Sequence, residues 1–361
     1  MVSTKPKVTW KTVLLPLLGL VVFFAYVYIY NVNIWQIIAT IQTINPYIYF
    51  LAAVAVILDT LFFTIAWYFL LRFLSVKLSI VKSLLFVWFG IFVDILIPAE
   101  SISGEISKIY LVTKEQNGTA GKVTASLVAQ RIIGMTINIV TLFIGAVLLL
   151  MERQLTGFML NLILILVTFT FLFLFLLLLL CIKERWTLRI VDAVIRFADR
   201  ISRGRWKLTK VREEVVEAAK AFHGAMRDFG HAPKTLIVAT SFSSISWILA
   251  LVVFQLSFLS VGYTAVSWSE ILVIGSIFTA VKSIPIGVPF EVGLPEITLT
   301  TLFYWVDVPI ETGATVTILM RILTLWFRFL IGFIAQQWLG IKTITAASTN
   351  SKIDHAKTEK T

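Results

Sequence analysis

Glutamate and arginine recur at a matched spacing within apolar stretches of this sequence. In the first half, Pro98 is followed by Gly104 and Glu105, and Arg131 lies 26 residues after Glu105. An arginine guanidinium can donate two parallel hydrogen bonds to a phosphate, and a neighbouring glutamate can orient the arginine or accept a proton. These residue types indicate a site for an anionic phosphate group.

The second half of the sequence repeats this arrangement. Pro285 and Pro289 precede Gly293 and Glu296, and Arg321 lies 25 residues after Glu296. Proline removes a backbone donor and glycine tolerates positive φ, so both suit a break in a helix. A charge at bilayer depth costs about 2.5–3.5 kcal/mol unless it is paired or hydrated. We therefore expect the glutamates and arginines of both halves either to line a polar groove or to form structural ion pairs.

Other charged residues lie singly in or beside the same apolar stretches. Asp59 and Asp94 are expected either to line a cavity or to make local hydrogen bonds. Lys282 and Arg328 are expected to reach a membrane interface. The additional groove candidates are Asp59, Asp94, Lys108 and Glu291.

The composition requires that these charges sit in a membrane protein. Hydrophobic residues make up 58% of the chain and charged residues 14%, with a mean hydropathy of +0.92, whereas soluble domains carry about 25% charged residues. The length of its apolar runs predicts an all-α polytopic membrane protein. The predicted spans are residues 12–30, 46–71, 121–150, 157–182, 234–260 and 312–340.

Two apolar stretches are too short to cross a bilayer alone and contain the proline and glycine breaks. We interpret residues 83–113 and 270–306 as re-entrant helical hairpins, because an interrupted helix at membrane depth must have its free backbone groups satisfied by protein or by a water-filled cavity.

The distribution of Lys and Arg predicts the orientation of the chain. With both termini cytoplasmic, nearly all loop Lys and Arg residues fall on the cytoplasmic side, and Arg153 is the exception. The two hairpins then enter from opposite sides and form an inverted repeat, an arrangement that places transporter substrates near the midplane. Residues 183–233 are predicted to form a cytoplasmic, amphipathic basic segment, with a stripe of Ile190, Val194, Phe197 and Ile201 and another of Val211, Val215, Phe222 and Met226. Residues 342–361 are predicted to form a disordered cytoplasmic tail.

Four short motifs resemble those of a known family. The segments SGEISKIYL (103–111), AQRIIG (129–134), PFEVGLPE (289–296) and MRILTLWFR (320–328) are similar to motifs of the lysylphosphatidylglycerol synthase transmembrane region family, although Phe290 and Glu291 stand where that family has glycines. The resemblance extends over about residues 48–341 and implies a flippase-like membrane domain that moves a lipid between leaflets. We expect no synthase domain within this sequence, because its longest polar stretch is 183–233.

The sequence therefore predicts a lipid flippase-like transporter in the plasma membrane that moves an anionic or modified phospholipid, or a polyprenyl-phosphate-linked lipid. Two alternatives remain: a membrane-embedded lipid-modifying transferase, and a non-catalytic membrane partner of a separate lipid synthase or glycosyltransferase. We expect no cofactor or metal, since His223, His231 and His355 lack metal-ligand spacing. Membrane orientation accounts for the net charge of +11, so nucleic acid is not an expected partner, whereas membrane lipids are.

Overall fold

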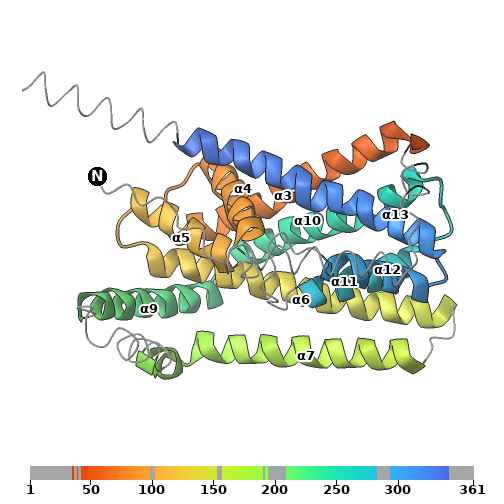
Figure 1. Ribbon diagram of the computed structural model, residues 1–361. Helices are drawn as coiled ribbons and strands as arrows, with labels where there is room; N and C mark the ends of the chain where they lie inside the picture. Colours follow the sequence, from red (N-terminus) through yellow and green to blue (C-terminus); the bar gives the residue numbers. More distant parts are fainter. Residues whose placement is uncertain are drawn as a thin grey trace, which may run out of the picture.

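The computed structural model describes residues 35, 39, 42–97, 102–152, 157–189, 192–193, 209–282 and 293–340. Within these residues the chain forms helices and no strand (Figure 1). Five helices are long and apolar enough to cross a membrane. The prediction of an all-α membrane protein is therefore confirmed, while the expected first span, 12–30, and the tail, 342–361, lie outside the described residues.

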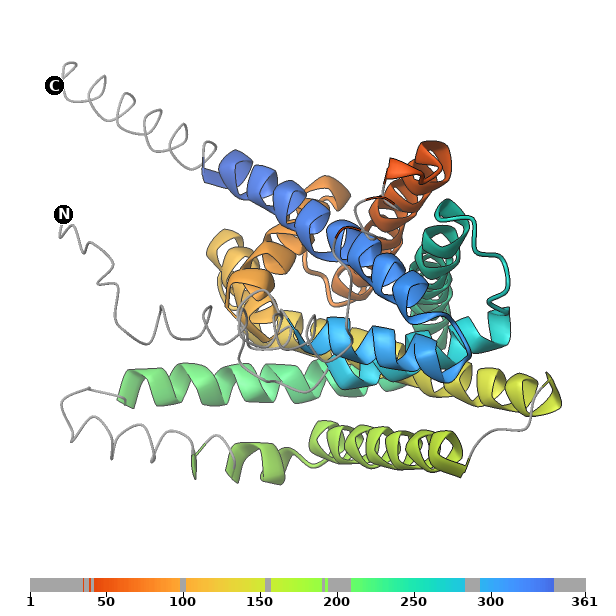
Figure 2. The ribbon, with the colours of Figure 1, turned by 45° about the vertical axis from the view of Figure 1, so that its right-hand side comes forward.

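The antiparallel pair α3 (Pro46–Phe73) and α10 (Pro233–Ser260) forms one side of the bundle. Both helices begin with proline at the first position, where the missing N–H costs no helical hydrogen bond, and the Asn45 side chain caps α3. The Asn45 N–H donates to the Ser260 carbonyl over 2.8 Å, which joins the start of α3 to the end of α10. The two helices run side by side in Figures 1 and 2.

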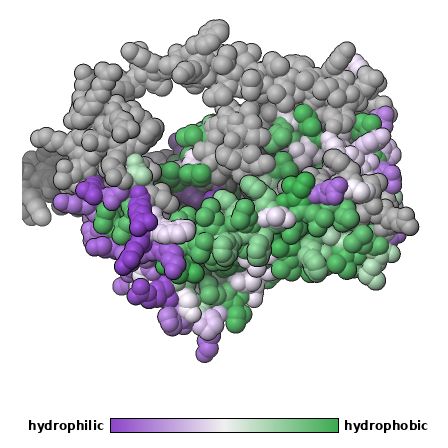
Figure 3. Space-filling model, turned by 90° about the horizontal axis from the view of Figure 1, so that it is seen from below, coloured by the Kyte–Doolittle hydropathy of each residue, from purple (hydrophilic) through white to green (hydrophobic). Residues whose placement is uncertain are grey.

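Two long helices, α6 (Ala120–Glu152) and α7 (Gly157–Ile182), lie on the opposite side. Helix α7 is the outermost, and Figure 3 shows a broad hydrophobic surface on the face where it lies. Large apolar side chains on α7 are exposed, as expected for a helix in contact with lipid: Leu164, Ile165, Phe169, Phe171 and Leu172.

Helix α9 (Thr209–Gly230) is the amphipathic part of the basic segment. It packs against α6, where a Cβ added to Gly121 would lie 2.2 Å from the Ala218 carbonyl oxygen, and its surroundings are the hydrophilic area of Figure 3. The stripe of Ile190, Val194, Phe197 and Ile201 lies outside the described residues.

Two pairs of short helices occupy the predicted hairpin regions. Helices α4 (Ile80–Leu96) and α5 (Ile102–Glu115) pack against each other, and so do α11 (Trp268–Lys282) and α12 (Leu294–Trp305). The breaks at Pro98, Pro285 and Pro289, and Glu291 beside the last, lie outside the described residues. Membrane re-entry and the inverted repeat therefore stay predictions.

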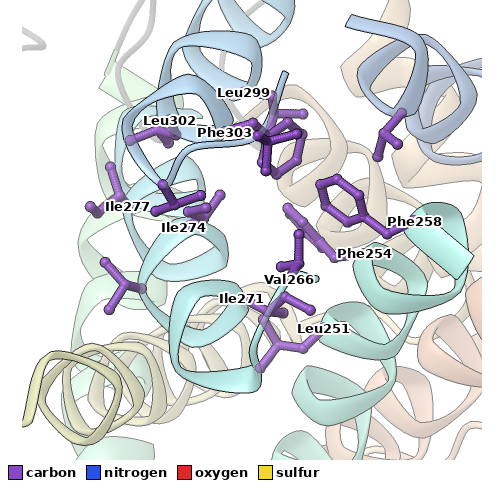
Figure 4. Close-up of a cluster of buried hydrophobic side chains, with 14 of the residues drawn as sticks. Leu251, Phe254, Phe258, Val266, Ile271, Ile274, Ile277, Leu299, Leu302 and Phe303 are labelled. Atoms are coloured by element: carbon purple, nitrogen blue, oxygen red, sulfur yellow. The ribbon is translucent and has the colours of Figure 1, made fainter. Parts of the chain in front are cut away.

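An apolar core holds α11 and α12 against α10. Figure 4 shows side chains from the three helices pointing toward one another, with the rings of Phe258 and Phe303 in an edge-to-face contact at a centroid distance of 4.8 Å. A second apolar cluster, around Trp67, joins α3 to α4, α5, α6 and α9. These two clusters fix the short helix pairs relative to the long helices.

The last spanning segment, Ile310–Gly340, is not a uniform α-helix. Helix α13 (Ile310–Arg321) continues into a π-helical stretch, η2 (Ile322–Phe327), before α-helical geometry resumes. A π turn adds a residue to the helical turn and is found most often at functional sites.

The contact between α6 and α9 generates a stability prediction. Gly121→Ala places a methyl group against backbone atoms of α9 and is expected to lower the free energy of unfolding by about 1–3 kcal/mol. Gly134→Ala is the matched control, because its added Cβ meets open space on the same helix. Thermal unfolding in detergent, followed by tryptophan fluorescence, measures both variants. Equal midpoints would contradict the close packing of α9 on α6.

Candidate functional site

Four charged residues of the first short helix pair and its neighbour gather in one cluster, which we call the first-half cluster: Asp94, Glu105, Lys108 and Arg131. They come from α4, α5 and α6 and interact electrostatically with one another. The Arg131 Nη2 atom lies 3.7 Å from Glu105 Oε1, and these two side chains are 34% and 24% exposed. This separation is too long for a hydrogen bond, so the ion pair is looser than a hydrogen-bonded one.

Lys108 is the most unusual member of the first-half cluster. The residue is only 7% exposed, and its ammonium makes no hydrogen bond or ion pair with any described residue. It lies 5.8 Å from the ring centroid of Phe63 and 5.4 Å from that of Trp67, both on α3. Cation–π attraction contributes about 2 kcal/mol when desolvated, which offsets only part of the cost of burying an ammonium.

Asp94 positions α5 within the cluster. Its Oδ1 atom accepts hydrogen bonds from the Ser103 hydroxyl and the Gly104 N–H, each 2.6 Å long, and so satisfies donors in the first turn of α5. A Cβ on Gly104 would lie 2.2 Å from Asp94 Oδ2, so only glycine allows this approach. Gly104, predicted as a hairpin break, thus lies within α5 at its closest contact with α4.

The aromatic floor of the cluster is fixed to α6. The Trp67 indole N–H donates to Ser126 Oγ over 2.9 Å, and the Gln130 amide donates to the Phe63 carbonyl over 2.8 Å. Gln130 immediately precedes Arg131, so the same turn of α6 holds the rings and presents the guanidinium.

The second Glu–Arg pair has a different geometry. Arg321 Nε donates to Glu296 Oε1 over 2.7 Å, and both residues are 5% exposed. The other oxygen, Oε2, accepts the Gly293 N–H over 2.7 Å at a backbone φ of +102°, which glycine adopts readily. Glu296 therefore both closes the start of α12 and joins α12 to the last spanning segment.

A third charged group joins α3, α10 and the last spanning segment. The sequence identifies Asp59 and Arg328 separately but does not predict that they pair. Asp59 accepts hydrogen bonds from Arg328 and, over 2.6 Å, from the Ser246 hydroxyl. The structure thus places Arg328 against a buried acid. The only signal in the sequence was one isolated charge in each of two apolar spans, because 269 residues separate the pair.

Comparison with known proteins agrees with this architecture. Residues 10–332 match the family described as lysylphosphatidylglycerol synthase TM region. The chain belongs to this family. The lysylphosphatidylglycerol synthase TM region is the membrane part and is not itself the catalytic synthase domain.

Two curated relatives of this family member are UPF0104 membrane proteins. The one from Pyrococcus horikoshii is 23% identical over 285 residues, which cover 78% of this chain and 84% of the relative. The one from Methanocaldococcus jannaschii is 23% identical over 337 residues, covering 92% and 96%. Among the described residues of this chain, no three His, Cys, Asp or Glu side chains are placed to hold a metal ion.

The difference between the two Glu–Arg pairs can be measured. Arg321→Met leaves the buried Glu296 carboxylate without its guanidinium and is expected to cost about 3–5 kcal/mol of stability. Arg131→Met disrupts a longer, partly exposed pair and is expected to cost less than about 1 kcal/mol. Thermal unfolding in detergent compares the variants, and Glu296→Gln combined with Arg321→Met should recover part of the loss. Equal losses from Arg131→Met and Arg321→Met would contradict the difference in packing.

Proposed function

We propose that this chain moves an anionic or modified phospholipid, or a polyprenyl-phosphate-linked lipid, between the leaflets of the plasma membrane. The first-half cluster binds the phosphate of the headgroup, and the chain is oriented with both termini in the cytoplasm. Membership of the family and the apolar surface of the helix bundle support a lipid as the cargo.

The observation that carries this proposal is the buried Lys108 ammonium, which makes no hydrogen bond or ion pair with any described residue and lies beside the long Glu105–Arg131 pair. An isolated buried charge is costly, and an incoming anion provides the missing partner. Asp94 is committed to the first turn of α5. Lys108 and Arg131 are the two cations of the cluster and can contact the single negative charge of a phosphodiester directly, while the charges of all four cluster residues sum to about zero.

The surface around the cluster suits a lipid rather than a soluble anion. On α5, the residues at one-turn intervals beside Glu105 and Lys108 expose apolar side chains: Ile102 at 47%, Ile106 at 59% and Tyr110 at 63%. A headgroup phosphate can therefore contact Lys108 while its acyl or isoprenoid chains remain in the surrounding lipid.

Glu296 and Arg321 have a different role in this proposal. Their hydrogen-bonded pair holds α12 against the last spanning segment in the conformation described. In the first-half cluster, Arg131 and Lys108 bind the phosphate, and Glu105 orients Arg131. In the predicted inverted repeat, the long Glu105–Arg131 pair and the short Glu296–Arg321 pair belong to one of two alternating conformations, and the two pairs exchange these geometries in the other conformation.

A leaflet-transfer assay tests the proposal. The protein is reconstituted in phosphatidylcholine vesicles with a fluorescent phosphatidylglycerol, and dithionite bleaches the label in the outer leaflet. Lys108→Met and Arg131→Ala are expected to lower the transfer rate by about tenfold or more, since each removes charge-assisted hydrogen bonds to phosphate.

Lys82→Met is the matched control. Lys82 lies on α4 in an exposed pair with Glu115, so its loss should leave transfer unchanged. Wild-type transfer rates in both cluster variants would remove the proposed site, and a covalently altered lipid found by mass spectrometry would assign a transferase instead.

A further inference from the structure

One face of α3 connects the first-half cluster to the Asp59–Arg328 pair. Asp59, Phe63 and Trp67 follow one another at intervals of four residues and therefore share a face. Phe63 and Trp67 lie beneath the Lys108 ammonium, whereas Asp59 holds Arg328. Since an α-helix rises about 1.5 Å per residue, Asp59 lies about 6 Å along the axis from Phe63 and about 12 Å from Trp67.

Arg328 has hydrogen-bond donors that the protein leaves unused. Its Nη2 atom donates to Asp59 Oδ2, while its Nε atom is buried without a hydrogen-bond partner. The side chain as a whole is 25% exposed, so Arg328 is not fully enclosed by the protein. The other Asp59 oxygen is fixed by Ser246, which leaves Arg328 held at one atom only.

The π-helical stretch explains why Arg328 faces α3. Arg321 and Arg328 are seven positions apart, a spacing that places two residues on nearly the same face of a regular α-helix. An added residue in the turn corresponds to about 100° of helical rotation. The stretch Ile322–Phe327 lies between the two arginines, and the helix directs Arg321 to Glu296 on α12 but Arg328 to Asp59 on α3.

We propose that Arg328 is a second phosphate-binding side chain, which receives the lipid headgroup from Lys108 and Arg131 as it moves along α3. Asp59 holds the guanidinium when no headgroup is present. The arriving phosphodiester accepts hydrogen bonds from an Nη atom and, once the side chain turns toward it, from the Nε atom that is buried in the conformation described. This inference rests on the proposed lipid transfer and adds a second position on the route of the headgroup.

The test removes the Arg328 guanidinium without leaving the buried Asp59 carboxylate unpaired. Asp59→Asn combined with Arg328→Gln keeps polar side chains at both positions, and Arg328→Lys keeps the charge but removes the planar fork. In the vesicle assay both variants are expected to lower transfer of fluorescent phosphatidylglycerol by about tenfold, the effect of one charge-assisted hydrogen bond. Binding of the same lipid to the detergent-purified variants should stay at the wild-type level, because the first-half cluster is intact.

Arg72→Gln is the control, since Arg72 is an exposed arginine on α3. Wild-type transfer in both Arg328 variants would overturn the second position and leave the proposed function intact, whereas absence of transfer in the wild type would overturn both. Arg328-dependent thermal stabilisation by inorganic phosphate but not by the lipid would assign the position to a free anion and also overturn it. The Arg328→Lys variant keeps the test decisive if the double variant fails to fold.

Discussion

A charged side chain enclosed by apolar helices must find a counter-charge, a hydrogen-bond partner or a ligand, because the surroundings screen it poorly. The structure meets this constraint in three ways. Glu296 and Arg321 form a closed, buried pair, and Asp59 and Arg328 form a pair with donors left over. Lys108 lies over two aromatic rings and interacts electrostatically with Glu105 and Asp94, but it makes no hydrogen bond or ion pair with any described residue. The proposed function follows from this order, because Lys108 makes the fewest direct contacts with acidic groups among the described residues and would gain most from binding an anion.

The same constraint shapes the backbone of the short helices. The first N–H groups of both α5 and α12 need acceptors, and Gly104 in α5 and Gly293 before α12 are buried. Asp94 from α4 supplies the acceptor for α5, and Glu296 supplies it for α12 from within its own first turn. Glycine is required at both places, by close approach at Gly104 and by positive φ at Gly293. Carboxylates thus hold in place both α5, which carries part of the first-half cluster, and α12, which carries Glu296.

The all-α membrane fold and the proximity of the Glu–Arg pairs could be predicted from the sequence, because apolar length and isolated charges are local signals. The Glu–Arg spacing identified two pairs of residues that lie close together, Glu105–Arg131 and Glu296–Arg321. It predicted the same role for both pairs, because spacing carries no information about how tightly neighbouring helices pack around them. The Asp59–Arg328 contact depends on α3 packing beside the last spanning segment, and the π-helical stretch has no recognised sequence signal. The position of Lys108 over two aromatic rings could not be predicted for a related reason, because those rings come from α3, far away in the sequence.

The central claim is that a lipid phosphate is the partner of the Lys108 ammonium. Native mass spectrometry of the protein purified from membranes, compared with Lys108→Met and Lys82→Met, tests it most directly. The account predicts a retained phosphate-containing lipid in the wild type and Lys82→Met, and its loss in Lys108→Met. Equal retention of that lipid in all three proteins, or none in any, would contradict the account.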